Sequence, residues 1–384
     1  MLRYNRNKVV KSVIVTGGLA LFLAACGSQA QGAVPRPNQT AASPPAIHHY
    51  GDLSNVKDRR QQLSQFISEH MMGPHGIYTN LLDTDQNGEL TTGHELLSES
   101  AGLMMRQAVL TGDKSGFDRI WGAARQTFDT DQLISYRYSP KLDKRFSVNA
   151  AVDDLRIIRA LYEAGAEFQA EEYRMEADRY GSRFYGTNVK NGQLYDFFDA
   201  DYGVTNDFIT LCYIDLKTLE LLPVDTADKN TLVEKMGTII QDGYLSDEFP
   251  FYSTRYDYSN ESYATGSVNT VESLLTILHL AEVGKHKPES ISFIKEKVSA
   301  GELFGRYSIS GKAETDIRST AIYAITAMIG SVLGDQALYD ESISKMNKFQ
   351  ISDKASGMLG GFGDTGTKQA YSFDNLMALL AYSY

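Results

Sequence analysis

The chain has 384 residues, of which 42% are hydrophobic, and its 37 basic and 48 acidic residues give a net charge of −11 at pH 7. An acidic surface of this kind repels nucleic acids and anionic lipid headgroups, so we expect neither as a binding partner. A chain of this length can build a large hydrophobic core, and its two cysteines leave the fold dependent on that core.

The N-terminus has the pattern of a secretory signal. Four basic residues in the first 11 positions precede the apolar run SVIVTGGLALFLAA (residues 12–25), which is too short to span a membrane comfortably. The sequence LAACG (residues 23–27) resembles the lipobox of bacterial lipoproteins, which implies cleavage before Cys26, lipidation of its thiol and tethering to a membrane. An ordinary secretory peptide with an incidental cysteine is the alternative.

The mature chain is predicted to consist of a tether and one domain. Loss of residues 1–25 removes four basic residues and no acidic one, so the net charge changes from −11 to −15. Residues 26–47 contain Cys26 and a stretch without acidic residues or apolar periodicity, which predicts a flexible tether. With Cys26 lipidated, Cys212 cannot form an intrachain disulfide. We expect residues 48–384 to form a monomeric domain held by lipid on the extracellular face of the cell membrane.

This domain is predicted to be almost entirely helical. Its helices alternate between apolar ones, such as TAIYAITAMIGSVL (residues 320–333), and amphipathic ones, such as QALYDESISKMNKF (residues 336–349). A helix that is apolar all round is buried, so the alternation predicts an inner ring of six helices wrapped by six outer helices. An α-solenoid is the alternative, but no motif repeats at a fixed period. The predicted helices, in hairpin pairs, are 52–72, 99–112, 114–128, 149–165, 169–187, 207–221, 227–242, 268–284, 288–300, 317–333, 335–349 and 372–383.

The segment DTDQNGELTTGH (residues 83–94) opens with the spacing of a calcium-binding EF-hand loop, through Asp83, Asp85 and Asn87. Position twelve of such a loop should be a bidentate glutamate, and here it is His94. The segment is therefore predicted to be a polar turn, with a weak cation site as the alternative. The seven histidines lack metal-ligand spacing as well, so we expect no metal and no cofactor.

An acidic residue begins the predicted helix at 99–112. Ser98 is a candidate N-cap, which places Glu99 in the first turn. A glutamate in this position can simply interact with the helix dipole. This helix, however, is too apolar for its first turn to point freely into water, which makes Glu99 a candidate functional carboxyl group.

Two further acids stand near the start of VNAAVDDLRIIRALYEA (residues 148–164), for which Asn149 is the candidate cap. Asp154 falls on the apolar stripe of the helix and should face inward, with Asp153 beside it. A buried acid is costly unless it is hydrogen-bonded or faces a cleft. Both are therefore candidate site residues.

Together these segments resemble glycoside hydrolase family 8. Members carry a Ser-Glu before an apolar helix containing methionine, then a Gly-Asp turn and a Phe-Asp-x-x-Trp motif, here Ser98-Glu99, Met104-Met105, Gly112-Asp113 and Phe117-Asp118-x-x-Trp121. The family signature Ala-[Ser/Thr]-Asp-[Ala/Gly]-Asp is partly kept, with Asp154 as its second aspartate, Val152 at the first and Asp153 between them. The resemblance covers most of residues 75–384. It implies an (α/α)6 barrel that hydrolyses β-linked polysaccharides with inversion.

Inverting hydrolysis needs one carboxyl group as acid and another as base. The resemblance implies that Glu99 is the acid. It also implies that Asp154 grips and distorts the sugar at the cleavage point, with Asp153 as the second choice, and that Trp121 contacts substrate. A helix N-terminus lowers the pKa of Glu99, so burial or the charge of Asp154 has to raise it for acid duty.

The base is expected in a loop. In much of the family it belongs to a Tyr-Asp-Ala-x-Arg segment, whose nearest match is SVNTVESLLTIL (residues 267–278), with Asn269 in place of the aspartate. An amide cannot accept a proton from water, so Asn269 is left with a substrate contact. Members with asparagine there recruit the base from a neighbouring loop, here residues 246–266. Asp257, at the centre of an aromatic cluster, is the expected base and Asp247 the alternative.

That loop also contains the aromatic residues expected to bind sugar. Tyr252, Tyr256 and Tyr258 suit stacking on sugar rings, and the alternative is that they pack the loop down.

The predicted function is therefore endo-acting, inverting hydrolysis of a β-linked exopolysaccharide. The resemblance adds a role beside an exopolysaccharide-synthesis machine, trimming its polymer or dispersing a biofilm. Glucan, xylan, chitosan and N-acetylhexosamine polymers all fit as substrates. The alternative is a non-catalytic polysaccharide-binding lipoprotein in which Asn269 replaced the base and no other carboxylate took its role.

Overall fold

The computed structural model describes residues 47–54, 56–86 and 91–384. The predicted signal peptide, Cys26 and the tether up to residue 46 lie outside the described residues, as does Asn87 of the candidate cation loop.

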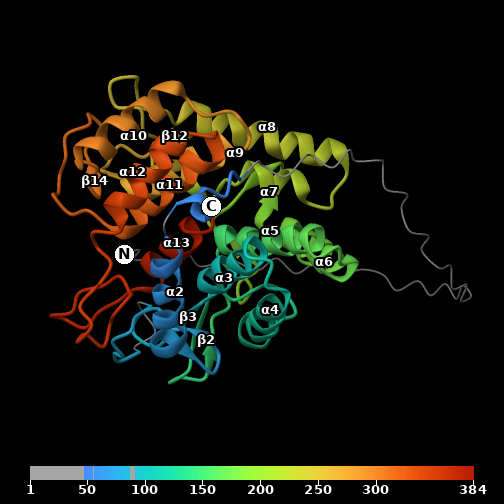
Figure 1. The fold of residues 1–384 in the computed structure, drawn as a ribbon. Helices are drawn as coiled ribbons and strands as arrows, with labels where there is room; N and C mark the ends of the chain where they lie inside the picture. The colour runs from blue at the N-terminus through green and yellow to red at the C-terminus, as the bar shows by residue number, and fades with distance from the viewer. Residues whose placement is uncertain (1–46, 55, 87–90) are drawn as a thin grey trace, which may run out of the picture. The chain divides into compact units, whose positions relative to one another are not determined.

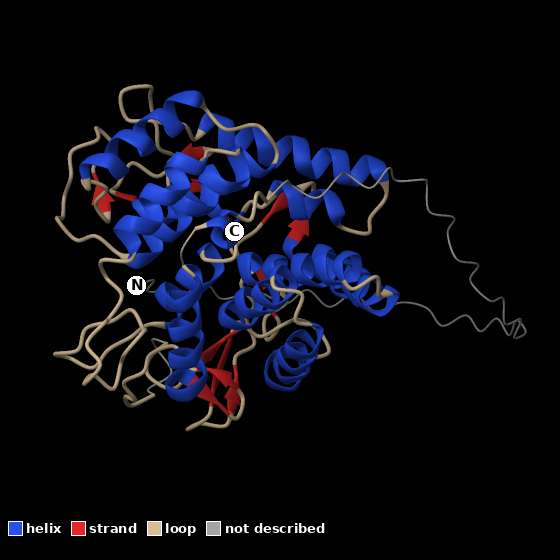
Figure 2. Ribbon diagram, viewed as in Figure 1, coloured by secondary structure: helices blue, strands red, loops and turns tan. Residues whose placement is uncertain are grey.

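Helices make up about half of the described residues, fewer than predicted, and they dominate the fold (Figures 1 and 2). Their bounds are α1 (Tyr50–Leu53), α2 (Lys57–Phe66), α3 (Ser98–Leu110), α4 (Lys114–Phe128), α5 (Ala151–Glu167), α6 (Glu171–Asn188), α7 (Leu216–Leu221), α8 (Thr226–Asp242), α9 (Thr270–Glu282), α10 (Pro288–Ala300), α11 (Thr320–Leu333), α12 (Gln336–Met346) and α13 (Ser372–Ala381). A π-helical turn, η1 (Ile67–Met71), continues α2, and a 3-10 turn, η2 (Leu211–Tyr213), precedes α7. The helices predicted at 114–128 and 288–300 have these same bounds.

Six helices form a closed inner ring in the order α3, α5, α7, α9, α11 and α13. Each packs against the next, and α13 packs against α3. The turn η2 supplements the short α7 by contacting both α5 and α9. The outer helices α4, α6, α8 and α12 pack on the inner helix that precedes each of them, and α10 packs against α11 and α12. The predicted all-α arrangement, an (α/α)6 barrel, is confirmed.

The sixth helix pair joins the two ends of the domain, which differs from the prediction of hairpins adjacent in sequence. The outer helix α2 packs on α13, although most of the chain separates them. At this seam the Gly51 amide donates a hydrogen bond to the Tyr384 carbonyl oxygen at 3.1 Å, and the Tyr384 side chain is fully buried.

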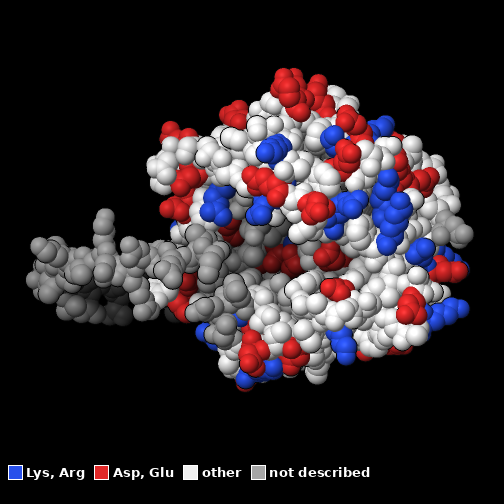
Figure 3. All heavy atoms as spheres, turned by 90° about the vertical axis from the view of Figure 1, so that its left-hand side faces the viewer, with Lys and Arg blue, Asp and Glu red and all other residues white. Residues whose placement is uncertain are grey.

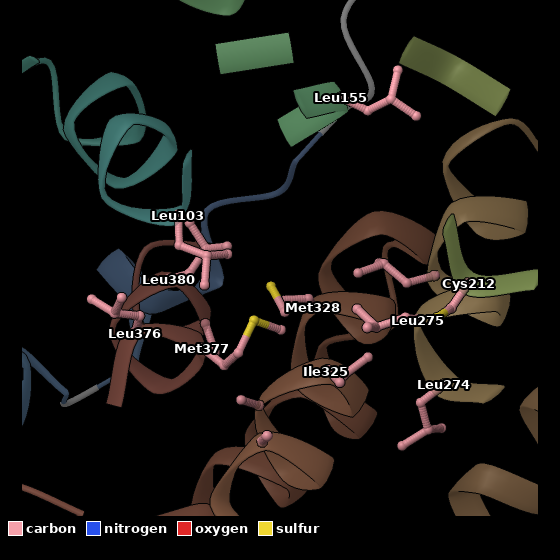
Figure 4. Close-up of a cluster of buried hydrophobic side chains, with 14 of the residues drawn as sticks. Leu103, Leu155, Cys212, Leu274, Leu275, Ile325, Met328, Leu376, Met377 and Leu380 are labelled. Atoms are coloured by element: carbon pink, nitrogen blue, oxygen red, sulfur yellow. The ribbon is translucent and has the colours of Figure 1, made fainter. Parts of the chain in front are cut away.

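Apolar side chains fill the interior of the ring. Figure 4 draws side chains of one buried cluster that come from five inner helices, among them Leu103, Leu155, Leu275, Met328 and Met377. Helix α11 is buried from Thr320 through Ser331, which explains why its sequence is apolar on all sides. Cys212 of η2 joins the same cluster as a buried free thiol.

Short antiparallel strands lie in the connections between helices (Figure 2). Strand β3 leads directly into α3 and β13 into α9, so two of the small sheets flank the N-terminal ends of inner helices. The strands are β1 (Met72–Gly73), β2 (Gly76–Ile77), β3 (Leu96–Leu97), β4 (Arg137–Ser139), β5 (Lys144–Arg145), β6 (Val189–Lys190), β7 (Gln193–Leu194), β8 (Phe198–Asp199), β9 (Val204–Thr205), β10 (Phe208–Thr210), β11 (Arg255–Asp257), β12 (Ser262–Tyr263), β13 (Val268–Asn269) and β14 (Arg306–Tyr307).

The predicted helix at 207–221 is the one that differs most from the structure. Its first residues form β10, which pairs with β11 so that Phe208 lies opposite Asp257. Aromatic and β-branched residues favour such a strand. Helix α7 starts only after Asp215, whose side chain accepts a hydrogen bond from the Thr218 amide and caps the helix.

Within the described part of the chain, each helix falls short of the length or apolarity needed to cross a membrane.

Candidate active site

The N-terminal ends of two adjacent inner helices bring Glu99 and Asp153 together. Glu99 is the second residue of α3 and Asp153 the third residue of α5. Arg156, one turn further along α5, links them, because its Nη1 lies 3.3 Å from Glu99 Oε2 and 2.8 Å from Asp153 Oδ1. The three residues are named here the acid cluster.

Each side chain of the acid cluster is partly exposed to solvent. The Glu99 side chain is 21% exposed, compared with 8% for Asp153 and 14% for Arg156. Burial raises the pKa of Glu99, and Arg156 partly opposes this shift. Burial and the negative charge of Glu99 together raise the pKa of Asp153 to about 7, again against Arg156. One cation serving two buried carboxyl groups thus favours retention of a proton near neutral pH, as a general acid requires.

Figure 3 shows a face of the domain that is hollowed, with acidic side chains inside the hollow. An acidic hollow of this kind is compatible with a neutral or cationic polymer rather than an anionic one.

Asp154 does not belong to the acid cluster, contrary to the first choice made from the sequence. Its Oδ2 accepts a hydrogen bond of 2.8 Å from Asn149 Nδ2, and it lines a narrow cavity beside Tyr180 and Arg183 of α6. Burial raises its pKa well above the usual range. Consecutive residues on a helix point about 100° apart, so only one of two neighbouring aspartates can face Glu99. That residue is Asp153, the second choice.

Neither predicted helix cap forms. Helix α3 has Leu97 at its N-cap position, and the buried Ser98 hydroxyl has no hydrogen-bond partner among the described residues. Asn149 stands one residue before the N-cap of α5. Its side-chain amide instead donates hydrogen bonds of 2.8 Å to Asp154 and to Asn188 of α6.

The turn before Glu99 is fixed by a buried ion pair. Glu95 and Arg137 are 0% and 1% exposed at their side chains, and Arg137 Nη2 lies 2.7 Å from Glu95 Oε1. A second carboxylate oxygen of Glu95 accepts the Thr92 amide at 2.8 Å. The sequence reading singled out the glutamate at 99 and missed the one at 95, which anchors the same segment.

In the candidate cation loop, a lysine already forms an ion pair with one of the carboxylates. Lys141 Nζ lies 3.0 Å from Asp83 Oδ2, so this carboxylate already has a cationic partner. Across the described residues, no group of three or more metal-binding side chains gathers in one place.

The two loop carboxylates proposed as base do not join the acid cluster. Asp257 lies on β11 and its Oδ1 accepts hydrogen bonds from the Ser259 and Asn260 amides, which fixes the turn toward β12. These bonds, led by one from the Ser259 hydroxyl, lower the pKa of Asp257. Asp247 is exposed and accepts a hydrogen bond from the Tyr244 hydroxyl at 3.0 Å. The polar turn residues after Asp257 explain its orientation.

The loop tyrosines pack against one another and against protein, with Tyr256 and Tyr258 partly exposed. Tyr252 is 2% exposed. Tyr256 contacts Tyr263 at 4.8 Å and Tyr258 at 5.6 Å between ring centroids, and Tyr258 also contacts Tyr195. The alternative interpretation, that these rings hold the loop down, fits this packing.

Trp121 lies away from the acid cluster, between the outer helices α4 and α6. Its Nε1 donates a hydrogen bond of 2.6 Å to Glu176, and its ring meets Tyr180 edge-on. This packing does not place Trp121 at the acid cluster, so the expected substrate contact has no support from its position.

Asn269 is the N-cap of α9. Its exposed side chain accepts hydrogen bonds from the Val271 and Glu272 amides, at 3.0 and 3.4 Å. This role accounts for an asparagine at the position where the resemblance expects a base.

Three further polar residues, Tyr213, Asp196 and Glu272, were not predicted from the sequence. The Tyr213 side chain is partly buried near both Asp153 and Asp196, and its pKa is raised by burial and by these charges. Burial raises the pKa of Asp196 to about 6. Glu272 stands in the first turn of a buried helix, as Glu99 does, and this shared pattern could have identified it. For Asp196 and Tyr213, in irregular segments, we find no such pattern.

The chain has recognisable relatives although no family model matches it. The structure of a protein described as a novel alpha-amylase from Clostridium perfringens is 34% identical, with a TM-score of 0.79, and the match covers 85% of this chain and 97% of that one. Endoglucanase Cel10, a family 8 glycosyl hydrolase from Klebsiella pneumoniae, is 14% identical with a TM-score of 0.58, over 84% of this chain and 97% of its own. The chain belongs to the same family as the clostridial protein. The Klebsiella enzyme shows that its fold is that of a family 8 glycosyl hydrolase.

A lipoprotein relative is also found. YdaJ of Bacillus subtilis strain 168, provisionally named a lipoprotein, is 27% identical to this chain over 337 residues, which are 84% of this chain and 86% of YdaJ.

A pH profile tests the electrostatics of the acid cluster. Glu99 and Asp153 repel each other when both are ionised, so Asp153→Asn is expected to lower the pKa of Glu99. An acid must be protonated to act, so the alkaline limb of kcat/KM should move to lower pH. The matched control, Asp247→Asn in the exposed loop, should leave that limb in place. An unchanged limb in Asp153→Asn would show that the two carboxyl groups are not coupled.

Proposed function

We propose that this protein is an inverting polysaccharide hydrolase in which Glu99 is the general acid. The observation that carries the proposal is the Glu99 carboxyl group, which is partly exposed, has a raised pKa and stands at an inner-helix N-terminus of a family 8-like barrel. Glu99 would donate its proton to the leaving glycosidic oxygen while a water attacks the opposite face of the sugar.

Asp153 and Arg156 would hold the sugar at the cleavage point. Their shared contact of 2.8 Å fixes both side chains beside Glu99, and Asp153 retains part of its surface for a sugar hydroxyl. This assigns to Asp153 the role that the resemblance first gave to Asp154.

The substrate we propose is a β-linked exopolysaccharide cut within the chain. Support comes from the family 8 fold, which includes the Klebsiella endoglucanase, and from the acidic hollow. A second candidate is an α-linked glucan, because the 34% identical clostridial relative is described as an alpha-amylase.

We place the protein as a monomer on the extracellular face of the cell membrane, anchored through a lipid on Cys26. The lipobox-like sequence LAACG and the provisional lipoprotein name of the Bacillus relative support this location. A role in exopolysaccharide production or dispersal would follow from such a position.

The test is release of reducing ends by the mature chain carrying Cys26→Ser. The panel contains β-linked glucan, xylan, chitosan and N-acetylhexosamine polymers, with an α-linked glucan beside them. Release from a β-linked polymer is expected, with a fall in viscosity that precedes most of the release if cleavage is internal. Release from the α-linked glucan alone would select the second candidate.

Binding without release from any polymer would favour a non-catalytic polysaccharide-binding lipoprotein. That alternative gains support from Asn269, because an amide that caps α9 stands where the resemblance expects a base. Asp257 and Asp247 are both engaged in local hydrogen bonds.

A further inference from the structure

The ring order identifies the helix that faces Glu99 across the barrel. The inner helices contact one another in the cycle α3, α5, α7, α9, α11 and α13, so α9 is opposite α3. Outer helices return the chain after each inner helix, which makes the inner helices run in the same direction. The first turns of α3 and α9 therefore lie at the same end of the ring, and they contain Glu99 and Glu272 respectively.

The Glu272 carboxyl group has polar neighbours, but one of its oxygens makes no hydrogen bond within the described residues. One of its oxygens, Oε2, is buried and has no hydrogen-bond partner among the described residues, and the same is true of Arg255 Nε. Burial raises the pKa of Glu272, while the Thr254 hydroxyl and the Arg255 charge lower it. The Arg255 guanidinium is itself stacked on the Phe208 ring at 3.7 Å, which restricts its movement.

Glu272 is connected to the acid cluster through Cys212. Burial raises the pKa of this thiol, with further contributions from Glu272 and Asp196 and an opposing one from Arg156. Glu272 and Arg156, the partner of Glu99, are thus both close enough to this thiol to act on its pKa.

Asp154 Oδ1 is also buried without a partner among the described residues, but Asp154 is on α5, next to α3 and not opposite it. Three other acids are already engaged. Both oxygens of Asp196 accept hydrogen bonds of 2.6 Å from Thr210, and Asp374 accepts the Ala321 amide at 2.9 Å. Asp257 is used in a turn.

We infer that Glu272 is the general base, acting from the helix opposite Glu99. The inference rests on the proposed function. In the step, the oxygen of a water forms a bond to the anomeric carbon as the bond from that carbon to the leaving oxygen breaks. The proton of Glu99 passes to the leaving oxygen, and a proton of the water passes to Glu272. The products are two shorter chains. The enzyme returns to its starting state when Glu272 loses a proton to solvent and Glu99 takes one up. A base within reach of ordinary proton transfer contributes on the order of 10²–10⁴-fold to the rate.

Glycosyl fluorides separate the two carboxyl groups, because fluoride leaves without protonation. The experiment uses the mature chain with Cys26→Ser and the fluoride of an oligosaccharide that the wild type cleaves. Glu99→Gln should lose the polymer but retain the fluoride, whereas Glu272→Gln should lose both by on the order of 10²–10⁴-fold. Azide should restore turnover to Glu272→Ala and give a glycosyl azide of inverted configuration. The matched control, Glu261→Gln on the exposed hairpin, should behave as the wild type.

Two outcomes would overturn the assignment. Glu272→Gln within about tenfold of the wild type on the polymer would exclude it as the base, and loss in Asp257→Asn instead would return that role to the loop. Circular dichroism and thermal melting distinguish loss of catalysis from loss of fold, and azide rescue requires a folded site. A wild type that cleaves no polymer would refute the proposed function itself, which is a different result.

Discussion

Glu99→Gln is expected to reduce kcat on a polysaccharide by on the order of 10²–10⁴-fold while leaving polymer affinity nearly unchanged. The amide oxygen can still accept the hydrogen bond from Arg156, but the amide has no acidic proton to give to a leaving group. Folding should be unaffected or slightly improved, because burial already disfavours the charged form of Glu99. Initial rates and a binding isotherm on the same polymer measure the two effects.

The control for this variant is Glu261→Gln, the same substitution on an exposed hairpin, which should keep full activity. Activity of Glu99→Gln within about tenfold of the wild type would rule out Glu99 as the acid.

The second large effect concerns stability. Arg137→Met leaves the Glu95 carboxylate buried without its cationic partner, which is expected to lower the free energy of unfolding by about 3–5 kcal/mol. Urea denaturation of both proteins measures the difference. Activity should fall as well, because Glu95 anchors the segment that leads into α3.

A matched control exists on the surface. Arg174 and Glu171 lie 3.4 Å apart with side chains 44% and 54% exposed, so Arg174→Met should change the free energy of unfolding by less than about 1 kcal/mol. The double variant Arg137→Met with Glu95→Leu should recover much of the loss, since no unpaired charge remains. Equal changes in the free energy of unfolding in Arg137→Met and Arg174→Met would show that the buried pair contributes no more to stability than the surface pair.

The helical ring was predictable because burial leaves a local pattern. Helices α4 and α10 have the predicted bounds, and α11 is apolar throughout because it is surrounded by protein. The pairing of α2 with α13 left no such pattern, since it depends on how the ring closes and not on neighbouring residues.

The site was predictable in part for the same reason. Glu99 was identified because an acid in the first turn of an apolar helix is unusual. The choice between Asp153 and Asp154 depended on a helix phase of one residue, and Asn149 turned out to hold Asp154 instead of capping the helix. The role of Asp257 depended on a turn conformation that its sequence neighbours do not reveal in advance.

The proposed base, Glu272, could not be predicted from the sequence because its position is defined across the ring. The nearest match to the family motif has Asn269 in place of the base, which directed the prediction to a nearby loop, whereas the ring order points to Glu272 three residues later. That relation exists only once α3 and α9 are known to face each other.

The central claim is inverting hydrolysis by this family 8-like barrel, and the anomeric form of the first product tests it most directly. Proton NMR of the wild-type reaction, recorded within the first minutes, distinguishes the two anomers before mutarotation mixes them. The account predicts that the new reducing end first appears in the configuration opposite to that of the cleaved bond. A product that first appears with the configuration of the cleaved bond would contradict it.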